Sequence, residues 1–411
     1  MRFFQHQNST SNGAPGKFHG RLADFRHSRL VATSVSVVVG FAMVTTIGVT
    51  PAHANPAYAS TVINGCTIVS HPTAATFTDC PDANLAGANL AGANLSFADL
   101  SGAQFVDCSN VFPYGCGDFT VLEGADLKDA DLSGADLLGV NLSSLNLYNV
   151  NLSAAILDRC LPPIDNQPEC YSATLAGANL TNANLSGADT STCSYVNFGG
   201  IIGSVAYCGG IFLSNAVLAG ANLSGDDLSF AVLSDANLIG ANLNSVKFGA
   251  CPTVSNEEFQ LCSTADFSGA RLGAVDLSGA QLNGVQFSGA DLLGANLSNA
   301  DLSPLQDPVG FDVISSNLSA ADLRRADLQG TNLGDSTLTG ARLDSARLDG
   351  ANLNGAGLSN ADLTHANLTD ANLDGASLTG ARLSGVTWSD TTCPDGTNSD
   401  SDGDSCVNNL S

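Results

Sequence analysis

Cysteine is the residue type whose number and spacing most clearly predict chemistry in this chain. The sequence contains 12 cysteines, all after residue 54. They fall in close successive pairs, which are Cys66/Cys80, Cys108/Cys116, Cys160/Cys170, Cys193/Cys208, Cys251/Cys262 and Cys393/Cys406. An even number of cysteines in such pairs is typical of an exported protein. Sequence alone leaves the connectivity open, but we predict six local disulfides, each stabilising the fold by roughly 3 kcal/mol on the loop-entropy model. No pair has the C-x-x-C spacing of zinc or thiol-redox sites.

A second set of candidate residues lies in the C-terminal tail. Asn398, Asp400, Asp402 and Asp404 alternate with other residues around a glycine, as in the first half of a calcium-binding loop. Carboxylates at alternate positions can converge on a hard cation. The glutamate expected six residues after the glycine is replaced by Asn409. Two interpretations follow, which are weak calcium binding and a solvated acidic turn.

The rest of the chain offers no set of residues for catalysis. Beyond residue 54 the histidines are His71 and His365, and every cysteine has a nearby partner. Rows of Asp could place two carboxylates side by side, as in a glycoside hydrolase, but Asp recurs there as a member of a repeated pattern. No P-loop or dinucleotide-binding motif is present. We therefore predict no catalytic residue, no cofactor site and a protein that is not an enzyme.

Residues 1–54 have the features of an export signal. A basic stretch ends at Arg29, an apolar run extends from Leu30 to Val49, and residues 52–54 (Ala-His-Ala) offer a cleavage site. The apolar run is also just long enough to span a membrane uncleaved. We expect a signal peptide, with an N-terminal anchor as the alternative, and a secreted, extracellular or cell-envelope location.

The charge of the chain restricts its partners. The formal net charge is −25, and a surface this negative repels nucleic acid and anionic lipid headgroups. We predict no nucleic-acid partner, and membrane contact only through an uncleaved N-terminal segment. The expected partner is an unknown protein or cell-envelope component, and the oligomeric state stays open. Solubility alone is the simpler explanation of the charge.

The main body of the chain has a period of five residues. Ala usually lies two positions before a recurring Leu or Phe, Asn or Asp one before, Ser or Thr one after, and Gly two after. Tracts with this spacing run over 85–105, 122–157, 175–185, 213–248, 267–302 and 318–383. An internal repeat of this kind decides the fold class before any other feature.

A period of five fits neither an α-helix nor a straight strand. Five residues turn an α-helix by about 500°, so successive leucines would make no stripe. On a strand, alternation would put them on opposite faces. The pattern closes only if each pentapeptide is a short extended piece followed by a corner, with Ala and Leu pointing inward. Gly, Asn and Asp suit such corners because they tolerate turn dihedrals. The sequence therefore predicts a solenoid with its own apolar core.

The repeat, for example Leu-Ser-Gly-Ala-Asp-Leu at 132–137, resembles the consensus of the pentapeptide-repeat family, Ala-Asp/Asn-Leu-x-x, over residues 83–388. The resemblance implies an all-β fold, a right-handed quadrilateral β-helix with four pentapeptides per turn. A turn of 20 residues predicts three vertical alignments. These are a column of alternating charge (Asp322, Arg342, Asp362, Arg382), an Asn ladder (Asn332, Asn352, Asn372), and Phe267 stacked under Phe287.

Non-repetitive segments divide and flank the solenoid. Residues 55–82 and 389–411 are expected to form short N-terminal and acidic C-terminal caps. The tail from Trp388 to Asp400 resembles that of secreted bacterial pentapeptide-repeat proteins. Insertions lie near 106–120, 158–172, 190–211, 249–265 and 303–316. The tract lengths predict that the last three leave the coil at one corner and the first two at a neighbouring corner. Such disulfide-closed loops are either functional or merely tolerated.

The function predicted from these features is that of a secreted, non-catalytic structural or binding scaffold. The family resemblance also implies an alternative, because some members are acidic rods that mimic DNA and inhibit or protect a type II topoisomerase. The export signal, the cysteines and the loops depart from that pattern. A third alternative is an extracellular enzyme acting on polysaccharides.

Overall fold

The computed structural model describes one of two compact units of the chain. The units are Met1–His53 and Ala54–Ser411, and all described residues belong to the second. The described residues are 61–408 except 109–115, 118, 161–169, 187, 189, 191–192, 198–203, 209, 244, 251–262 and 307–312. The predicted signal peptide or anchor therefore lies outside the described residues.

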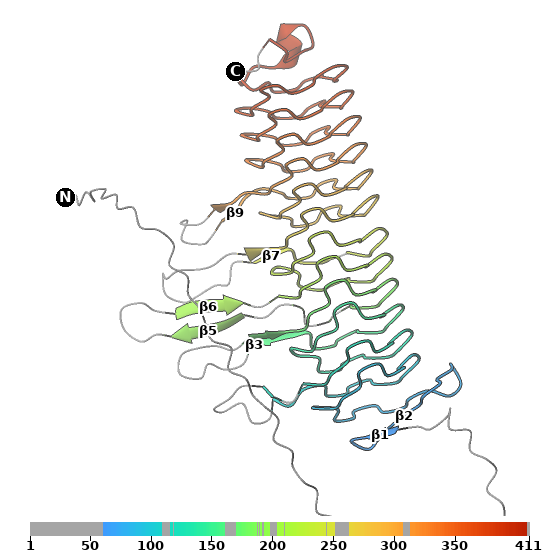
Figure 1. Cartoon of the computed structure of the whole chain (residues 1–411). Coiled ribbons are helices and arrows are strands. Elements are labelled where there is room, and N and C mark those ends of the chain that lie inside the picture. The colour runs from blue at the N-terminus through green and yellow to red at the C-terminus, as the bar shows by residue number, and fades with distance from the viewer. Residues whose placement is uncertain are drawn as a thin grey trace, which may run out of the picture. The chain divides into compact units, whose positions relative to one another are not determined.

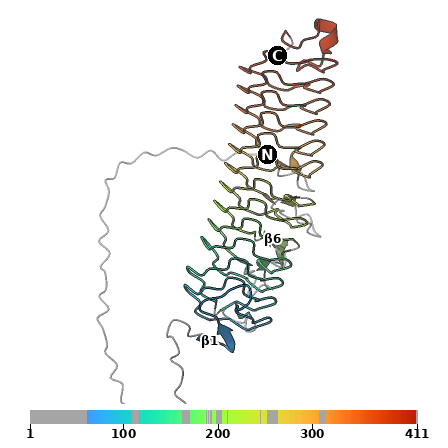
Figure 2. The same ribbon diagram turned by 90° about the vertical axis from the view of Figure 1, so that its right-hand side faces the viewer.

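Residues 78–392 form a coil in which each turn pairs with the turns before and after it. At most levels without an insertion, parallel bridges join residues 20 positions apart, as between Asp322 and Arg342. Because 20 residues hold four pentapeptides, the coil has four faces, and Figures 1 and 2 show its turns stacked on one another. In chain order, face 1 carries Thr337 and Gly357, face 2 Arg342 and Asp362, face 3 Arg347 and Asn367, and face 4 Asn352 and Asn372.

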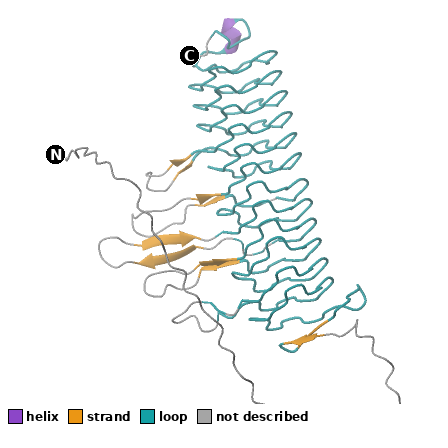
Figure 3. Cartoon of the chain, in the orientation of Figure 1, coloured by secondary structure: helices purple, strands orange, loops and turns teal. Residues whose placement is uncertain are grey.

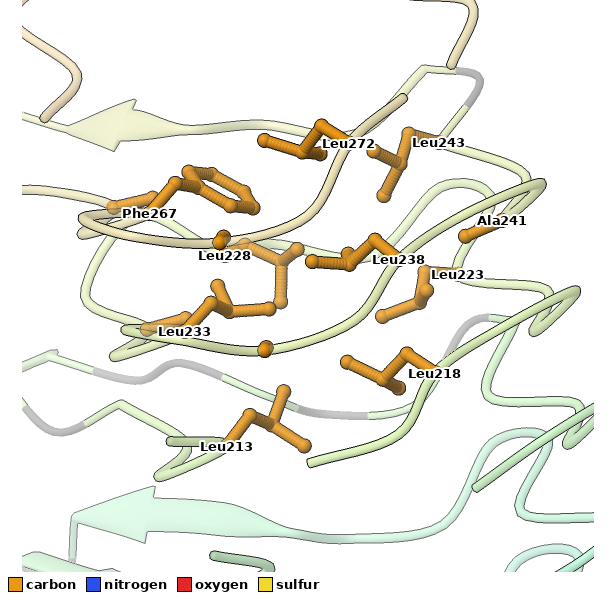
Figure 4. Close-up of a cluster of buried hydrophobic side chains, with 14 of the residues drawn as sticks. Leu213, Leu218, Leu223, Leu228, Leu233, Leu238, Ala241, Leu243, Phe267 and Leu272 are labelled. Atoms are coloured by element: carbon orange, nitrogen blue, oxygen red, sulfur yellow. The ribbon is translucent and has the colours of Figure 1, made fainter. Parts of the chain in front are cut away.

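The recurring Leu and Phe side chains fill the interior of the coil. Leu323, Leu343 and Leu363 are completely buried, and so are the alanines two positions before them. Figure 4 shows such side chains from successive turns meeting inside the coil. Complete burial of each leucine contributes about 1.5–3 kcal/mol, so the predicted inward positions are the core. The predicted aromatic stack is also present, with ring centroids of Phe267 and Phe287 separated by 5.3 Å.

Nearly every described corner is a tight turn with a left-handed residue. At one corner Ala366 N donates a hydrogen bond to Leu363 O at 2.9 Å, and His365 between them has φ of 60°. A β-turn with positive φ at its third position favours Gly or Asn there, which explains the residue two after each leucine. The corner side chain leans over the next turn, because a Cβ added at Gly385 would overlap the His365 ring. His365 is thus a corner residue, as its position in the repeat predicts.

Where Asn or Asp precedes the leucine, its side chain commonly closes its own turn. Its side-chain oxygen accepts a hydrogen bond from the backbone nitrogen two residues later, as Asp131 does from Ser133 at 2.9 Å. In the last tract Asn352 Nδ2 donates to Asn332 Oδ1 at 2.9 Å, so the predicted Asn ladder is present. The predicted charge column is present too, since Arg342 and Arg382 pair with Asp322 and Asp362 at 3.1 and 3.2 Å.

Regular strands occur outside the coil, as short antiparallel hairpins (Figure 3). The hairpins are β1 (Thr61–Ile63) with β2 (Cys66–Ile68), β3 (Asp158–Cys160) with β4 (Cys170–Ser172), β5 (Cys193–Asn197) with β6 (Ser204–Cys208), β7 (Gly249–Ala250) with β8 (Ser263–Thr264), and β9 (Leu305–Gln306) with β10 (Val313–Ile314). The first hairpin precedes the coil, and the other four project from it.

Both ends of the coil are covered. At the N-terminal end the β1–β2 hairpin is tied to the first turn by the disulfide Cys66–Cys80. At the C-terminal end residues 393–406 are closed by the disulfide Cys393–Cys406 and contain the 3-10 helix η2 (Ser399–Asp402). Ser399 Oγ donates to the carbonyl of Trp388, which anchors this segment on the last turn.

Candidate functional site

All five insertions leave the coil at one corner, between face 4 of one turn and face 1 of the next. The bridges place Gln104, Ile156, Lys247 and Asp301 on face 4, and the next bridged residue after each insertion lies on face 1. Thr190 is the inward face 4 residue before the third insertion, since its hydroxyl donates to Asp227 O at 2.6 Å. The edge formed by this corner, here named the loop edge, is the most distinctive surface of the coil (Figure 1).

The prediction that the first two insertions leave at a neighbouring corner is wrong. The leucine pattern gives the third tract three repeats, Leu175 to Leu185, because no Leu or Phe follows at the next step. The structure contains a fourth repeat there, in which Thr190 takes the inward position and is only 1% exposed. Adding this repeat brings the first two insertions to the same corner as the others. A buried threonine with a satisfied hydroxyl can replace leucine at this position, so the loops form one row.

Paired cysteines lie at the bases of three of these loops within the described residues. Besides the two disulfides at the ends of the coil, Cys108 and Cys116 form a disulfide at the first insertion. In the next two hairpins the strand register places Cys160 opposite Cys170 and Cys193 opposite Cys208. Cys251 and Cys262 lie outside the described residues.

The first two loops are anchored to each other by a small apolar cluster outside the coil. Val106, Cys116 and Leu138 are buried together, and the rings of Phe119 and Tyr171 pack against them with centroids 6.1 Å apart. Cys116 N donates a hydrogen bond to Tyr171 Oη at 3.1 Å, although the residues are 55 positions apart. The bases of the two loops therefore form one packed unit on the coil.

The coil wall is open at two levels close to the loop edge. Turns 242–248 and 276–282 are not bridged to each other, although each is bridged to the turn on its other side. A cleft of about 560 Å³ lies between them, lined by Leu243, Ser245, Val246, Lys247, Phe248, Gly249, Asp276, Leu277, Ser278, Gly279, Ala280, Gln281 and Asn283. We name it the Leu243 cleft. No irregularity in the leucine spacing marks this level, so the sequence carried no signal for it.

The second opening interrupts face 1 beside the first loop. Val121 bridges Asn89, and Asn141 bridges Thr174, but Val121 and Asn141 do not bridge each other. The Phe119 ring lies against Gly139, where an added Cβ would come within 2.7 Å of it. The resulting cleft, named the Phe119 cleft, has a volume of about 650 Å³. Both openings thus lie next to positions where an insertion enters or leaves the coil.

Charged groups on face 2 are paired rather than uniformly negative. The Arg324 guanidinium donates to both carboxylate oxygens of Asp322, at 2.8 and 2.7 Å, and lowers the pKa of that carboxyl, with a further contribution from Arg342. The pKa of Asp362 is lowered mainly by the hydrogen bond from Thr364 and also by Arg382. These ion pairs make the column a stabilising structural feature.

Two of the four tail residues predicted as calcium ligands, Asn398 and Asp400, have structural partners. Asn398 Oδ1 accepts from Asp400 N at 2.9 Å, and Asp400 Oδ1 accepts from Asp390 N at 2.9 Å. Asp402 ends η2 and Asp404 follows it in a left-handed conformation. Among the described residues, no three His, Cys, Asp or Glu side chains lie together in a metal-binding group. Calcium binding by Asn398, Asp400, Asp402 and Asp404 stays a prediction.

The described residues also give a finding on membrane spans. None of the helices that they form has the length and apolar character needed to cross a bilayer. The apolar run from Leu30 to Val49 lies outside them.

Comparison with known proteins identifies the repeat. The family model of pentapeptide repeats matches in 8 copies, over residues 76–109, 120–160, 169–189, 213–249, 265–303, 316–355 and 356–387. Together these segments make up more than half of the chain. No curated protein matches the chain.

Several solved structures of pentapeptide-repeat type are similar to the chain. HetL from the cyanobacterium Nostoc, involved in regulation of heterocyst differentiation, is 27% identical, with 78% of this chain and 91% of HetL covered and a TM-score of 0.20. A protein from the Arabidopsis thaliana thylakoid lumen is 27% identical, with 30% and 72% covered and a TM-score of 0.18. QnrB1, a plasmid-mediated fluoroquinolone resistance protein, is 18% identical, with 59% and 84% covered and a TM-score of 0.29. At these TM-scores the superpositions carry no functional argument.

The family assignment rests on the repeat itself. The matched segments coincide with the turns whose leucines are buried and whose polar residues form bridges 20 positions apart. The chain belongs to the pentapeptide-repeat family, and its coil is the right-handed quadrilateral β-helix of that family.

Proposed function

We propose that the chain is an exported, non-catalytic scaffold that presents the row of loops on its loop edge to a protein of the cell envelope or surroundings. The observation that carries the proposal is that all five insertions leave at one of four corners. Insertions tolerated at random would be spread over the corners. Loops held on a rigid framework are also where binding residues concentrate.

The charge distribution supports a protein partner over DNA mimicry. In the last tract the face 2 column alternates Asp with Arg, and face 1 carries uncharged Asn317, Thr337, Gly357 and Ser377. A surface that imitates the DNA backbone needs regular rows of negative charge. The fluoroquinolone-resistance role belongs to QnrB1. A supercoiling assay tests this alternative, and protection of a type II topoisomerase by the purified protein would favour it.

The export element of the proposal has a direct test. If residues 1–54 are a cleaved signal, protein recovered from the medium or envelope will begin at Asn55 on N-terminal sequencing. Protein that stays in the cytoplasm would contradict export. Protein that stays in the membrane with residues 1–54 attached would support the anchor.

The binding element is tested with two deletions that affect different levels of the coil. Replacing residues 193–208 by two glycines removes the β5–β6 hairpin from the loop edge. Deleting residues 337–356, one whole turn without an insertion, keeps the register and every loop. We expect labelled protein to bind producing cells, the hairpin deletion to reduce binding at least about tenfold, equivalent to about 1.4 kcal/mol, and the turn deletion to leave it unchanged. Equal binding by both variants would contradict the proposal.

A further inference from the structure

The Leu243 cleft is an interruption of hydrogen bonding on two consecutive faces. On the N-terminal side of the cleft, Leu223 N donates to Asn242 O at 3.0 Å and Leu228 N donates to Lys247 O at 2.8 Å. On the C-terminal side of the cleft, Leu277 N donates to Asn296 O and Leu282 N donates to Asp301 O, both at 2.7 Å. No such bond joins turn 242–248 to turn 276–282 among the described residues. The coil thus stays continuous above and below the cleft.

The cleft is closed at both ends, which makes it a slot rather than a break. On face 2 Leu238 N still donates to Arg271 O at 2.8 Å. At the loop edge Gly249 approaches the backbone of the next turn, because an added Cβ would lie 3.0 Å from Asn283 O. The two walls are therefore held in a fixed relation across faces 3 and 4.

Main-chain groups line both walls of the slot. By the pattern of the neighbouring turns, Leu243 N and Phe248 N would donate to turn 276–282. Asp276 N and Gln281 N would donate in the opposite direction, toward the turn that contains Leu243. The carbonyls of Ala241, Val246, Asp276 and Gln281 would accept these bonds. The slot thus presents two strand edges that face each other, and an open strand edge is a template for pairing with another chain.

The floor of the slot is apolar and its charges balance. Leu243, Val246 and Leu277 are 4%, 6% and 3% exposed, whereas most inward leucines of the coil are at 0%. Lys247 and Asp276 contribute one charge of each sign to the lining. The lining therefore favours an uncharged ligand with an apolar side chain.

We propose that the Leu243 cleft binds an extended, uncharged peptide segment, which pairs through its main chain with both walls and points an apolar side chain at the floor. This deepens the proposed function, since it names the kind of segment that a partner of the scaffold would insert. Main-chain hydrogen bonds supply the affinity in such strand addition, and alternate side chains supply the specificity.

The neighbouring turns show which sequence suits the walls. Directly below the slot, turn 242–248 pairs with the segment Ala221-Asn222-Leu223. On the other side of the slot, Leu277 N donates to Asn296 O and Asn296 N donates to Val275 O, so this wall pairs with Asn296 in the segment Ala295-Asn296-Leu297. A segment with this alternation of small, polar and apolar residues would match both walls. At about 3.3 Å per residue, a segment of six residues spans one face and its corners.

The probe is the acetylated, amidated peptide Gly-Ala-Asn-Leu-Ser-Gly, which has the sequence of residues 220–225. Hydrogen exchange of the whole exported protein is followed at the amides of Leu243, Phe248, Asp276 and Gln281. Without peptide these amides are expected to exchange at least about tenfold faster than that of Leu277, whose ladder bond is made. Millimolar peptide is expected to slow them at least about tenfold, and the same peptide with N-methylated Asn and Leu amides is expected to have no effect.

A matched pair of variants locates the effect. Ser278→Trp places a large side chain in the lining of the slot, and Ser298→Trp places it one turn higher on the same face, where the wall is closed. Peptide protection should be lost in Ser278→Trp and kept in Ser298→Trp. The exchange of Leu277 reports whether each variant keeps the coil intact.

Two results would overturn the proposal. If the four amides exchange as slowly as Leu277 without peptide, the walls pair with each other in solution. If they exchange fast but millimolar peptide does not slow them, water fills the slot. The β5–β6 deletion separates this proposal from the function of the loop edge, because it should reduce cell binding at least about tenfold while peptide protection remains.

Discussion

The last tract of the coil, residues 317–388, and the interrupted region, residues 85–302, are built from the same pentapeptide yet differ in their hydrogen bonding. In the last tract every turn bridges its neighbour on all four faces. In the interrupted region the wall is open at the Leu243 and Phe119 clefts. Both openings lie next to an insertion. An insertion therefore leaves the leucine positions unchanged but can separate adjacent turns, and clefts form where loops join the coil.

The largest expected difference between the last tract and the interrupted region is in core substitutions. Leu343→Ala removes a completely buried side chain between two closed turns, and we expect it to lower the free energy of unfolding by about 4 kcal/mol. Leu277→Ala, beside the Leu243 cleft, should cost about 2 kcal/mol because its surroundings already include an opening. Denaturant titration of both variants measures the difference. Equal losses would mean that the cleft is closed in solution.

A smaller effect is expected at the corners of the last tract. Gly350→Ala and Gly385→Ala each force a side chain into positive φ, at 68° and 73°, which costs about 1–2 kcal/mol. At Gly350 the space is empty, whereas at Gly385 the new Cβ meets the His365 ring. We expect Gly385→Ala to lower the thermal midpoint further than Gly350→Ala. Adding His365→Ala to Gly385→Ala should remove this additional fall in the thermal midpoint. If the additional fall is unchanged, the contact between the corner residues of successive turns does not affect stability.

The smallest effect concerns the charge column. The pKa of Asp322 is lowered, mainly by the hydrogen bond from Arg324, so this carboxylate stabilises the fold above the unfolded pKa of about 4, and the contribution is lost as the pH falls through the lower folded pKa. Asp322→Asn should lower the free energy of unfolding by about 0.5–1 kcal/mol at pH 7. Unfolding titrations at pH 7 and about pH 2.5 should show the loss only at pH 7. A loss of equal size at both values would assign the effect to packing.

Most of the fold follows from the sequence because a single period fixes it. The leucine at every fifth position determines the core, and a turn of 20 residues correctly aligned Asp322 with Arg342, Asn332 with Asn352, and Phe267 with Phe287. The predicted corner of the first two loops is wrong, because Thr190 fills an inward position without resembling a leucine. Such a substitution is visible only when the neighbouring turn supplies Asp227 O as its hydrogen-bond acceptor.

The clefts could not be predicted for a different reason. Leu243 and Leu277 occupy regular positions in the repeat, and their local sequences resemble those of closed turns. Whether two turns pair depends on how the intervening insertion sets their distance, which is a property of the assembled coil. The candidate binding slot is thus a tertiary feature without a local sequence pattern.

The corner between faces 4 and 1 has a consequence for engineering. Paired residues are separated by 20 positions at Asn332 and Asn352, by 33 at Asn146 and Asn179, and by 38 at Asn184 and Asn222, yet they make the same ladder contact. At these three levels the ladder contact is therefore kept although different lengths of chain are inserted at this corner. Foreign epitopes or small domains grafted there would be displayed in a row, at heights chosen in steps of one turn.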